Sequence, residues 1–202
     1  MGRPWGIHPG VAHGAAILAN LERNSGRGPE AWLALAREAG AVDLKAARAF
    51  FRERGLGMSA AGWLAEMAAG QEPETPESYL AKCPGYLDAQ YAGARAALRP
   101  LLDRILDAAY GLGADVTACP CRTLVSIYRR RVFAEVKPFA SRLDLGLVLG
   151  DPAKLAGRAP RLVDTGGFAK KDRITLKLEV RSAADLDGDL EGWLRRAYDL
   201  DV

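Results

Sequence analysis

The stretch RLDLGLVLG, residues 142–150, decides the fold of the C-terminal half of the chain. Its leucines at 143, 145, 147 and 149 alternate with Arg142, Asp144 and Gly146. Because successive side chains of a β-strand point to opposite faces, this spacing predicts a strand with one apolar face and one polar face.

Three further segments extend this strand into a sheet. RITLKLEV, residues 173–180, is predicted to turn Ile174, Leu176, Leu178 and Val180 inward and Arg173, Thr175, Lys177 and Glu179 outward. TLVSIYRR, residues 123–130, and RVFAEVKP, residues 131–138, predict two strands joined by a charged hairpin connection at residues 129–131. We therefore expect an antiparallel four-stranded sheet.

The rest of the chain is predicted to be helical, which makes the fold class α+β. Four short helices are expected between residues 9 and 70, with Pro9 and Pro29 in first turns and Asp43 and Ser59 as N-caps. Residues 87–112 predict one or two helices, kinked or divided at Pro100. A final helix, N-capped by Ser182, is expected to cover the apolar face of the sheet.

The domain organisation follows from a change of composition. GQEPETPES, residues 70–78, is rich in proline, acid and small residues, as surface connections are. The sequence therefore predicts a helical domain over residues 1–70, a linker over 71–78 and an α+β domain over 79–202.

Composition limits the possible partners and the location. Among the 202 residues, 28 Lys and Arg nearly balance 25 Asp and Glu, for a net charge of +3. A strongly basic arm is missing, so any basic surface must be assembled by folding. The chain starts without a signal-peptide pattern and has no apolar run of about 20 residues, the length that spans a bilayer. We expect a cytoplasmic protein with no membrane partner; the oligomeric state stays open.

Few residues are suited to catalysis or to metal binding. The histidines are His8 and His13, and Cys119 and Cys121 are separated by one proline. We expect His8 to pack at the start of the first helix and the two cysteines to lie together on a buried face, because zinc would need further ligands. The sequence predicts no catalytic residue, no metal and no cofactor, and it favours a role other than that of an enzyme.

The loop DTGGFAKKDR, residues 164–173, has the composition of an anion site. Gly166 and Gly167 can direct backbone N–H groups at one point, and Lys170, Lys171 and Arg173 add positive charge. The alternative is a turn followed by solvated lysines. The glycine spacing matches neither the Walker nor the Rossmann pattern.

The charged face of the sheet is the second candidate site. The strand phases predict that it displays basic and aromatic side chains, interrupted by Glu135, Asp144 and Glu179. Its members are Arg122, Ser126, Tyr128, Phe133, Lys137, Arg142, Arg173 and Lys177, with Arg129 at the hairpin. Interleaved cations and rings bind single-stranded nucleic acid, whereas cross-strand ion pairs explain the same pattern without a ligand.

The sequence of residues 45–67 predicts two helices joined by a Gly-Leu-Gly turn. A DNA-reading helix needs Arg, Lys, Asn or Gln near its start, and this one has Ser59, Ala60, Ala61, Gly62 and Trp63. We therefore expect a plain helical hairpin.

Several long segments carry a resemblance to a known family. They are IHPGVAH at residues 7–13, EAWLALAREAG at 30–40, RERGLGMSAAGWLAE at 52–66, ACPCRTLVSIYRRRVFAEVKP at 118–138, RLDLGLVLG and DTGGFAKKDRITLKLEV at 164–180. The chain resembles bacterial proteins that pair a small helical domain with an α+β domain, both of unknown function. The resemblance implies this architecture and no activity. Relatives of the second domain are sometimes joined to nuclease-type domains, which favours a nucleotide or nucleic acid as partner.

These observations favour a non-enzymatic module that binds a nucleotide or single-stranded nucleic acid. The predicted contacts are the loop glycines and cations together with Arg122, Tyr128, Arg129 and Lys137. Two alternatives stay open: a small-ligand receptor or enzyme with a pocket between the domains, lined by His8, Trp63 or Tyr128, and a scaffold or dimerisation protein.

Overall fold

The structure is a computed structural model that describes residues 4–155 and 160–201. The chain divides into two compact units. The helical unit is Ile7–Ala81, and the sheet unit joins the residues up to Gly6 with those from Lys82 onward. Among the described residues, no helix combines the length and the apolar character needed to span a membrane.

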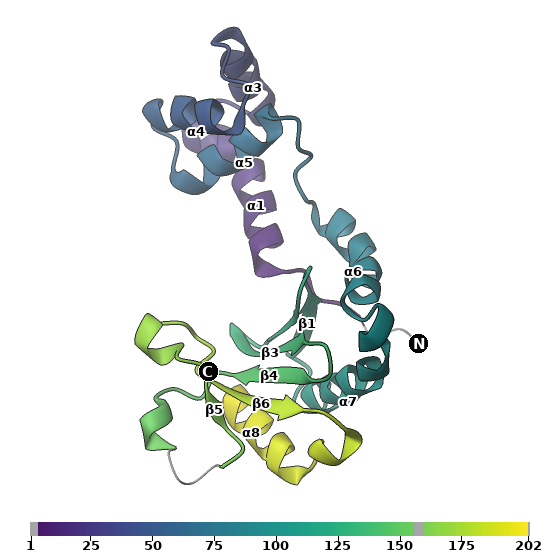
Figure 1. The fold of residues 1–202 in the computed structure, drawn as a ribbon. Coiled ribbons are helices and arrows are strands. Elements are labelled where there is room, and N and C mark those ends of the chain that lie inside the picture. The colour runs from purple at the N-terminus through teal and green to yellow at the C-terminus, as the bar shows by residue number, and fades with distance from the viewer. Residues whose placement is uncertain (1–3, 156–159, 202) are drawn as a thin grey trace. The chain divides into compact units, whose positions relative to one another are not determined.

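The sheet unit is built on one antiparallel sheet in the order β1-β2-β3-β4-β6-β5 (Figure 1). The strands are β1 (Thr117–Pro120), β2 (Val125–Tyr128), β3 (Val132–Pro138), β4 (Leu143–Leu147), β5 (Val163–Asp164) and β6 (Leu176–Val180). The α+β class is confirmed, but the prediction of four strands is wrong. The two additional strands, β1 and β5, are the edges of the sheet.

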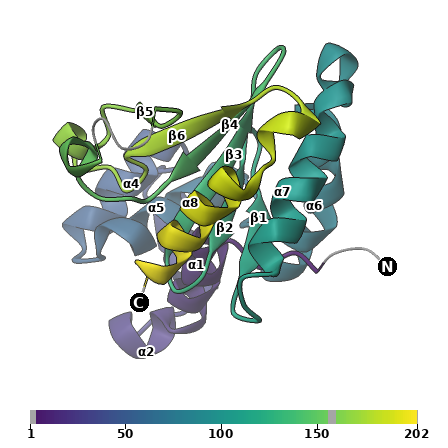
Figure 2. The same ribbon diagram turned by 90° about the horizontal axis from the view of Figure 1, so that it is seen from below.

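Two helices pack on the apolar face of this sheet, α7 (Arg99–Tyr110) and α8 (Gly188–Asp199). Figure 2 shows both helices crossing the same face of the strands. Leu145 and Leu147 of β4, Ile105 of α7 and Leu194 of α8 belong to one core cluster and are fully buried. Burial of this shared apolar surface holds the layers together.

Two side chains lie on faces other than those predicted. A bulge between Ile127 and Tyr128 shifts the pairing of β2 with β3, so Phe133 points into the core and meets the ring of Tyr198 edge-on. Ile174 precedes β6 and lies against the opposite face, where its Cγ2 would be 2.7 Å from a Cβ placed on Gly146. The alternation predicted for β6 therefore holds only from Leu176 onward.

The remaining helices before the sheet are α6 (Pro76–Gln90) and a 3₁₀ segment η1 (Gly93–Leu98). Pro100 lies in the first turn of α7, where its missing N–H costs no intrahelical bond. At the C-terminal end, Ser182 caps the short η4 (Ala183–Asp185), and Asp187 caps α8 by accepting from Leu190 N. Ser182 is therefore not the N-cap of α8, because η4 comes between them.

The helical unit contains α1 (Pro9–Ala19), α2 (Leu21–Ser25), α3 (Pro29–Glu38), α4 (Leu44–Glu53) and α5 (Met58–Ala68). Asp43 caps α4 as predicted, with Oδ1 accepting from two backbone N–H groups. Gly57, and not Ser59, precedes α5. Trp32 and Phe51 meet edge-on in a separate core cluster.

Candidate nucleotide and nucleic-acid interface

The outer face of the sheet is the face opposite α7 and α8, and its charges are largely paired with one another. Asp144 accepts from Arg142 Nε at 2.7 Å and from Lys177 Nζ at 2.6 Å. Glu179 lies 3.3 Å from Arg142 and 2.7 Å from Arg181. Cross-strand ion pairs, the alternative raised by the sequence, therefore account for Arg142 and Lys177.

Two carboxyl groups on this face have pKa values shifted in opposite directions. Burial opposes ionisation of Asp144, but the hydrogen bonds from Arg142 and Lys177 outweigh it and lower its pKa. Burial raises the pKa of Glu135, and the charge of Lys137 only partly offsets this effect. The outer face thus holds a fixed anion at Asp144 and a carboxyl at Glu135 that protonates more readily.

Arg129 ties the β2–β3 hairpin to the C-terminal helix. Its Nε donates to Oδ2 of Asp115 at 2.8 Å, and its Nη1 donates to the carbonyl of Tyr198 at 3.3 Å. The Tyr198 hydroxyl donates to the other oxygen of Asp115 at 2.8 Å. Hydrogen bonds from Arg129 and Tyr198 lower the pKa of Asp115. Arg129, predicted as a ligand contact, is bound within the fold.

Arg173 has a similar internal role. Its Nη2 donates to Oδ1 of Asp201 at 3.0 Å, and its Nε donates to the carbonyl of Val132 at 3.2 Å. Asp201 is 4% exposed and also accepts from the backbone N–H groups of Arg130 and Arg131. Arg173 therefore links the start of β6 to the hairpin and to the last described residues of the chain.

The tip loop, residues 164–172, has its glycine N–H groups occupied. Gly166 N donates to Oδ1 of Asp164 at 2.7 Å, and Gly167 N donates to Oγ1 of Thr165 at 3.1 Å. The carbonyl of Gly167 accepts from Lys170 N and Asp172 N. The glycines shape a closed turn with Gly166 at φ +71°, and their N–H groups do not form the predicted anion cradle.

The short helix η3 (Phe168–Lys170) and the following Lys171 carry an exposed ring and two exposed cations of the tip loop. Phe168 is 50% exposed. Lys170 and Lys171 are exposed, and neither forms an ion pair among the described residues. The sequence interpretation did not include Phe168 among the candidate contacts, although it lies between a Gly-Gly turn and two lysines.

The other predicted contacts lie apart from the tip loop in the sheet. Arg122 is exposed in the turn between β1 and β2. Lys137 is exposed on β3, with its Nζ 5.6 Å from the ring centre of Phe139. Tyr128 ends β2, and burial raises its pKa against the effect of a hydrogen bond with Ser126. The predicted set is therefore divided between exposed cations and structural arginines.

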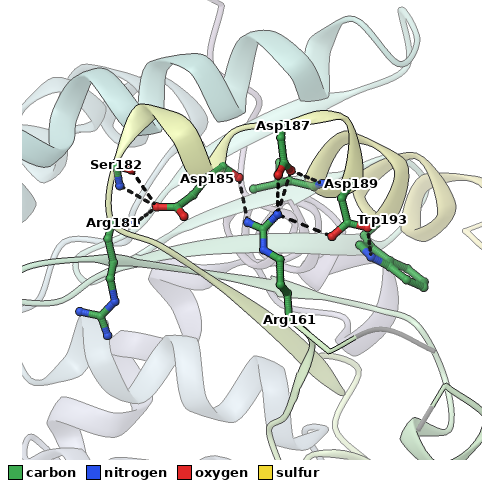
Figure 3. A network of polar contacts seen from close by, with 8 residues as sticks. Arg161, Arg181, Ser182, Asp185, Asp187, Asp189 and Trp193 are labelled. Carbon is green, nitrogen blue, oxygen red and sulfur yellow. Dashed lines mark hydrogen bonds and ion pairs between the residues drawn. The ribbon is translucent and has the colours of Figure 1, made fainter. Parts of the chain in front are cut away.

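A second polar network surrounds Arg161 (Figure 3). Its Nη1 lies 2.8 Å from both carboxylate oxygens of Asp187, and its Nη2 donates to the carbonyl of Asp185 at 2.9 Å. Asp189 lies 3.6 Å from Arg161 and accepts from Trp193 Nε1. The aspartates before and at the start of α8 hold Arg161 against the helix, and Asp187 also caps it.

His8 lies at the start of α1, Cys119 lies in β1, and Cys121 directly follows that strand. His8 caps α1 through Nδ1, which accepts from Gly10 N at 3.1 Å, and burial lowers its pKa against the charge of Glu74. Cys119 is buried and Cys121 is half-buried, both as free thiols. Within residues 4–155 and 160–201, no three His, Cys, Asp or Glu residues are grouped as metal ligands.

A comparison with family models matches residues 87–201, which is more than half of the chain, to a domain of unknown function (DUF5655). The chain belongs to this family. The DUF5655 domain contains the whole sheet, α7, α8, the tip loop and the Arg161 network. The expected membership of an uncharacterised C-terminal family is thereby confirmed. No curated protein and no solved structure matches the chain.

Proposed function

We propose that this protein is a binding module for a phosphate-bearing partner, a nucleotide or single-stranded nucleic acid, and that the tip loop of its DUF5655 domain makes the main contact. The observation that carries the proposal is the half-exposed ring of Phe168 within four residues that also contain Lys170 and Lys171. An exposed ring can stack on a base, and lysines can contact the adjoining phosphates.

The ion pairs of the other cations support the tip loop as the main contact among the predicted binding residues. Arg129 and Arg173 are bound to Asp115 and Asp201, and Arg142 and Lys177 to Asp144. A phosphate at any of these four would compete with a carboxylate already in place. Lys170, Lys171 and Arg122 form no ion pair among the described residues, whereas the charge of Lys137 acts on Glu135.

The test is a titration of the full chain, at low salt, into a fluorescein-labelled oligothymidylate of about 20 nucleotides, longer than the site of one binding fold. Phe168→Ala is expected to weaken binding by about 1–3 kcal/mol, the range measured for loss of base stacking. Lys170→Ala with Lys171→Ala is expected to reduce the salt dependence of log K by about 0.7 per lost contact.

A matched control removes two exposed cations elsewhere in the sheet unit, Arg104→Ala with Lys154→Ala. It is expected to bind almost as the unmutated protein does. Equal weakening in both double variants would mean that only overall charge matters. Absence of binding to the oligonucleotide and to ATP by the unmutated protein would refute the proposal.

A further inference from the structure

The helical unit carries a stripe of three cations on α4, Lys45, Arg48 and Arg52, which we call the α4 stripe. Their spacings of three and four residues place them on one side of the helix, and all three are exposed. Within the described part of the chain none of them forms an ion pair. Arg52 donates only to the carbonyl of Leu56, at 2.8 Å.

This arrangement is unfavourable for the helix itself. Like charges at spacings of three and four residues repel each other along a helix surface. Lys45 also lies in the first turn, where the helix dipole favours acids, and α4 has no acidic residue in that turn. The helix dipole favours Arg52, which lies in the last turn, but helix stability does not explain Lys45 or its spacing from Arg48, whereas an anionic ligand would.

Hollows on both sides leave the stripe accessible. One, of about 470 Å³, is bounded by Arg48 and Arg52 on α4 and by Met58, Ser59 and Gly62 on α5. The other, of about 400 Å³, is lined by Leu44, Lys45, Arg48, Ala49 and Arg52. Arg48 and Arg52 line both hollows, so they form a ridge between them. Glu66 is the carboxylate that lines the first hollow.

We propose that the α4 stripe binds the phosphate backbone of a nucleic-acid duplex without regard to sequence. The seven steps along the chain from Lys45 to Arg52 rise about 10 Å along the helix axis. That is the axial length of about three nucleotides of one duplex strand. The planar guanidinium groups of Arg48 and Arg52 match phosphate oxygens in pairs.

The residues around the stripe favour a nucleic acid over an acidic protein. Protein interfaces are depleted of charge at their centre, whereas backbone contacts to nucleic acids consist of charge. The first half of α5 offers Ser59, Ala60, Ala61 and Gly62, which lack the side chains that read base edges. The choice of nucleic acid as partner rests on the proposed function, but the stripe shares no residue with the tip loop.

The test measures the affinity of the unmutated protein and of the variant Lys45→Ala/Arg48→Ala for two fluorescein-labelled duplexes of unrelated sequence. The measurement is repeated at rising salt concentrations. The slope of log K against log salt is expected to fall by about 0.9 per lost phosphate contact, equally for both sequences. The melting temperature of this variant should not fall, because repulsion between the cations is relieved.

Glu66→Gln should tighten duplex binding, because it removes the carboxylate that lines the first hollow. Arg23→Ala with Arg37→Ala removes two cations from other helices of the unit and should change little.

Unchanged duplex binding in Lys45→Ala/Arg48→Ala, or an equal loss in the control, would overturn the proposal. Binding to polyglutamate in place of duplex would assign the stripe to an acidic protein and overturn it as well. Lys170→Ala/Lys171→Ala should keep the salt slope of duplex binding while reducing the salt slope of single-strand binding. The proposal for the tip loop and the proposal for the α4 stripe can therefore be refuted independently of each other.

Discussion

Nζ of Lys177 lies 2.6 Å from Oδ2 of Asp144, on neighbouring strands of the outer face. With Arg142 on the other oxygen, Asp144 is paired with two cations that would otherwise attract phosphate, and Glu179 also lies 3.3 Å from Arg142. The charge pattern of the outer face is therefore a feature of sheet stability, and the binding that we propose relies on the exposed cations of the tip loop.

Asp144→Asn should destabilise the sheet unit. The substitution leaves Arg142 and Lys177 without a carboxylate, and loss of hydrogen bonds to a charged group costs about 1.5–3 kcal/mol. Urea denaturation measures the change. Asp172→Asn, at an exposed carboxyl that forms no ion pair with the rest of the described chain, should cost much less. Equal effects of the two substitutions would contradict the structural role of Asp144.

Asp201→Asn should loosen the hairpin and the C-terminal helix together. Asp201 is 4% exposed and joins Arg173 to the backbone of Arg130 and Arg131. We expect a loss of about 1.5–3 kcal/mol in the free energy of unfolding. The exposed neighbour Asp199→Asn serves as the control. Arg173→Ala should lower the free energy of unfolding in the same way. Any effect of this substitution on ligand binding should be a consequence of the lower stability.

Acid should weaken the Arg161 network. Backbone hydrogen bonds from Arg181 and Ser182 lower the pKa of Asp185. The backbone N–H of Leu190, and then the side chain of Arg161, lower the pKa of Asp187 by hydrogen bonding to its carboxylate. A carboxyl whose pKa is lower in the folded state stabilises the fold above its unfolded pKa, and this stabilisation is lost as pH falls through the folded pKa.

The melting temperature should therefore decline as pH falls below about 4, the ordinary pKa of an aspartate. Asp185→Asn with Asp187→Asn should lower stability at neutral pH and flatten this decline. The check is a series of thermal melts from neutral pH downward. A decline of the same steepness in the double variant would assign the acid sensitivity to other carboxyl groups.

Gly167→Ala should disturb the tip loop without changing its charge. A Cβ on Gly167 would collide with the carbonyl oxygen of Ile174, so the turn before Phe168 must move. We expect weaker binding of the oligothymidylate and lower stability. Gly192→Ala in α8, where a Cβ meets open space, should stabilise by up to about 1 kcal/mol. Full binding by Gly167→Ala would show that the shape of the turn is unimportant.

The central strands could be predicted because both of their faces are constrained. Leu143 to Leu147 and Leu176 to Leu178 alternate between a core and a charged face, and the alternation survives in the structure. The two edge strands, β1 and β5, could not be predicted in this way. β5 has two residues, and β1 ends at Pro120, which an edge strand tolerates because it pairs on one side only.

The candidate site was less predictable because it depends on which partner each cation meets. Arg129 and Lys170 look alike in the sequence, yet one lies 2.8 Å from Asp115 and the other forms no ion pair among the described residues. These contacts join residues far apart in the chain. Phe133 was misplaced for a similar reason, since a single bulge reverses the face of a side chain.

The most direct test of the tip loop as the binding site is to map the bound oligothymidylate by backbone amide NMR shifts on the full chain. We predict that the shifts of the sheet unit concentrate at residues 166–172 of the tip loop, with little change at Asp144, Lys177 and their strands. Shifts concentrated on the outer face around Glu135 and Asp144, with the tip loop unchanged, would contradict this prediction.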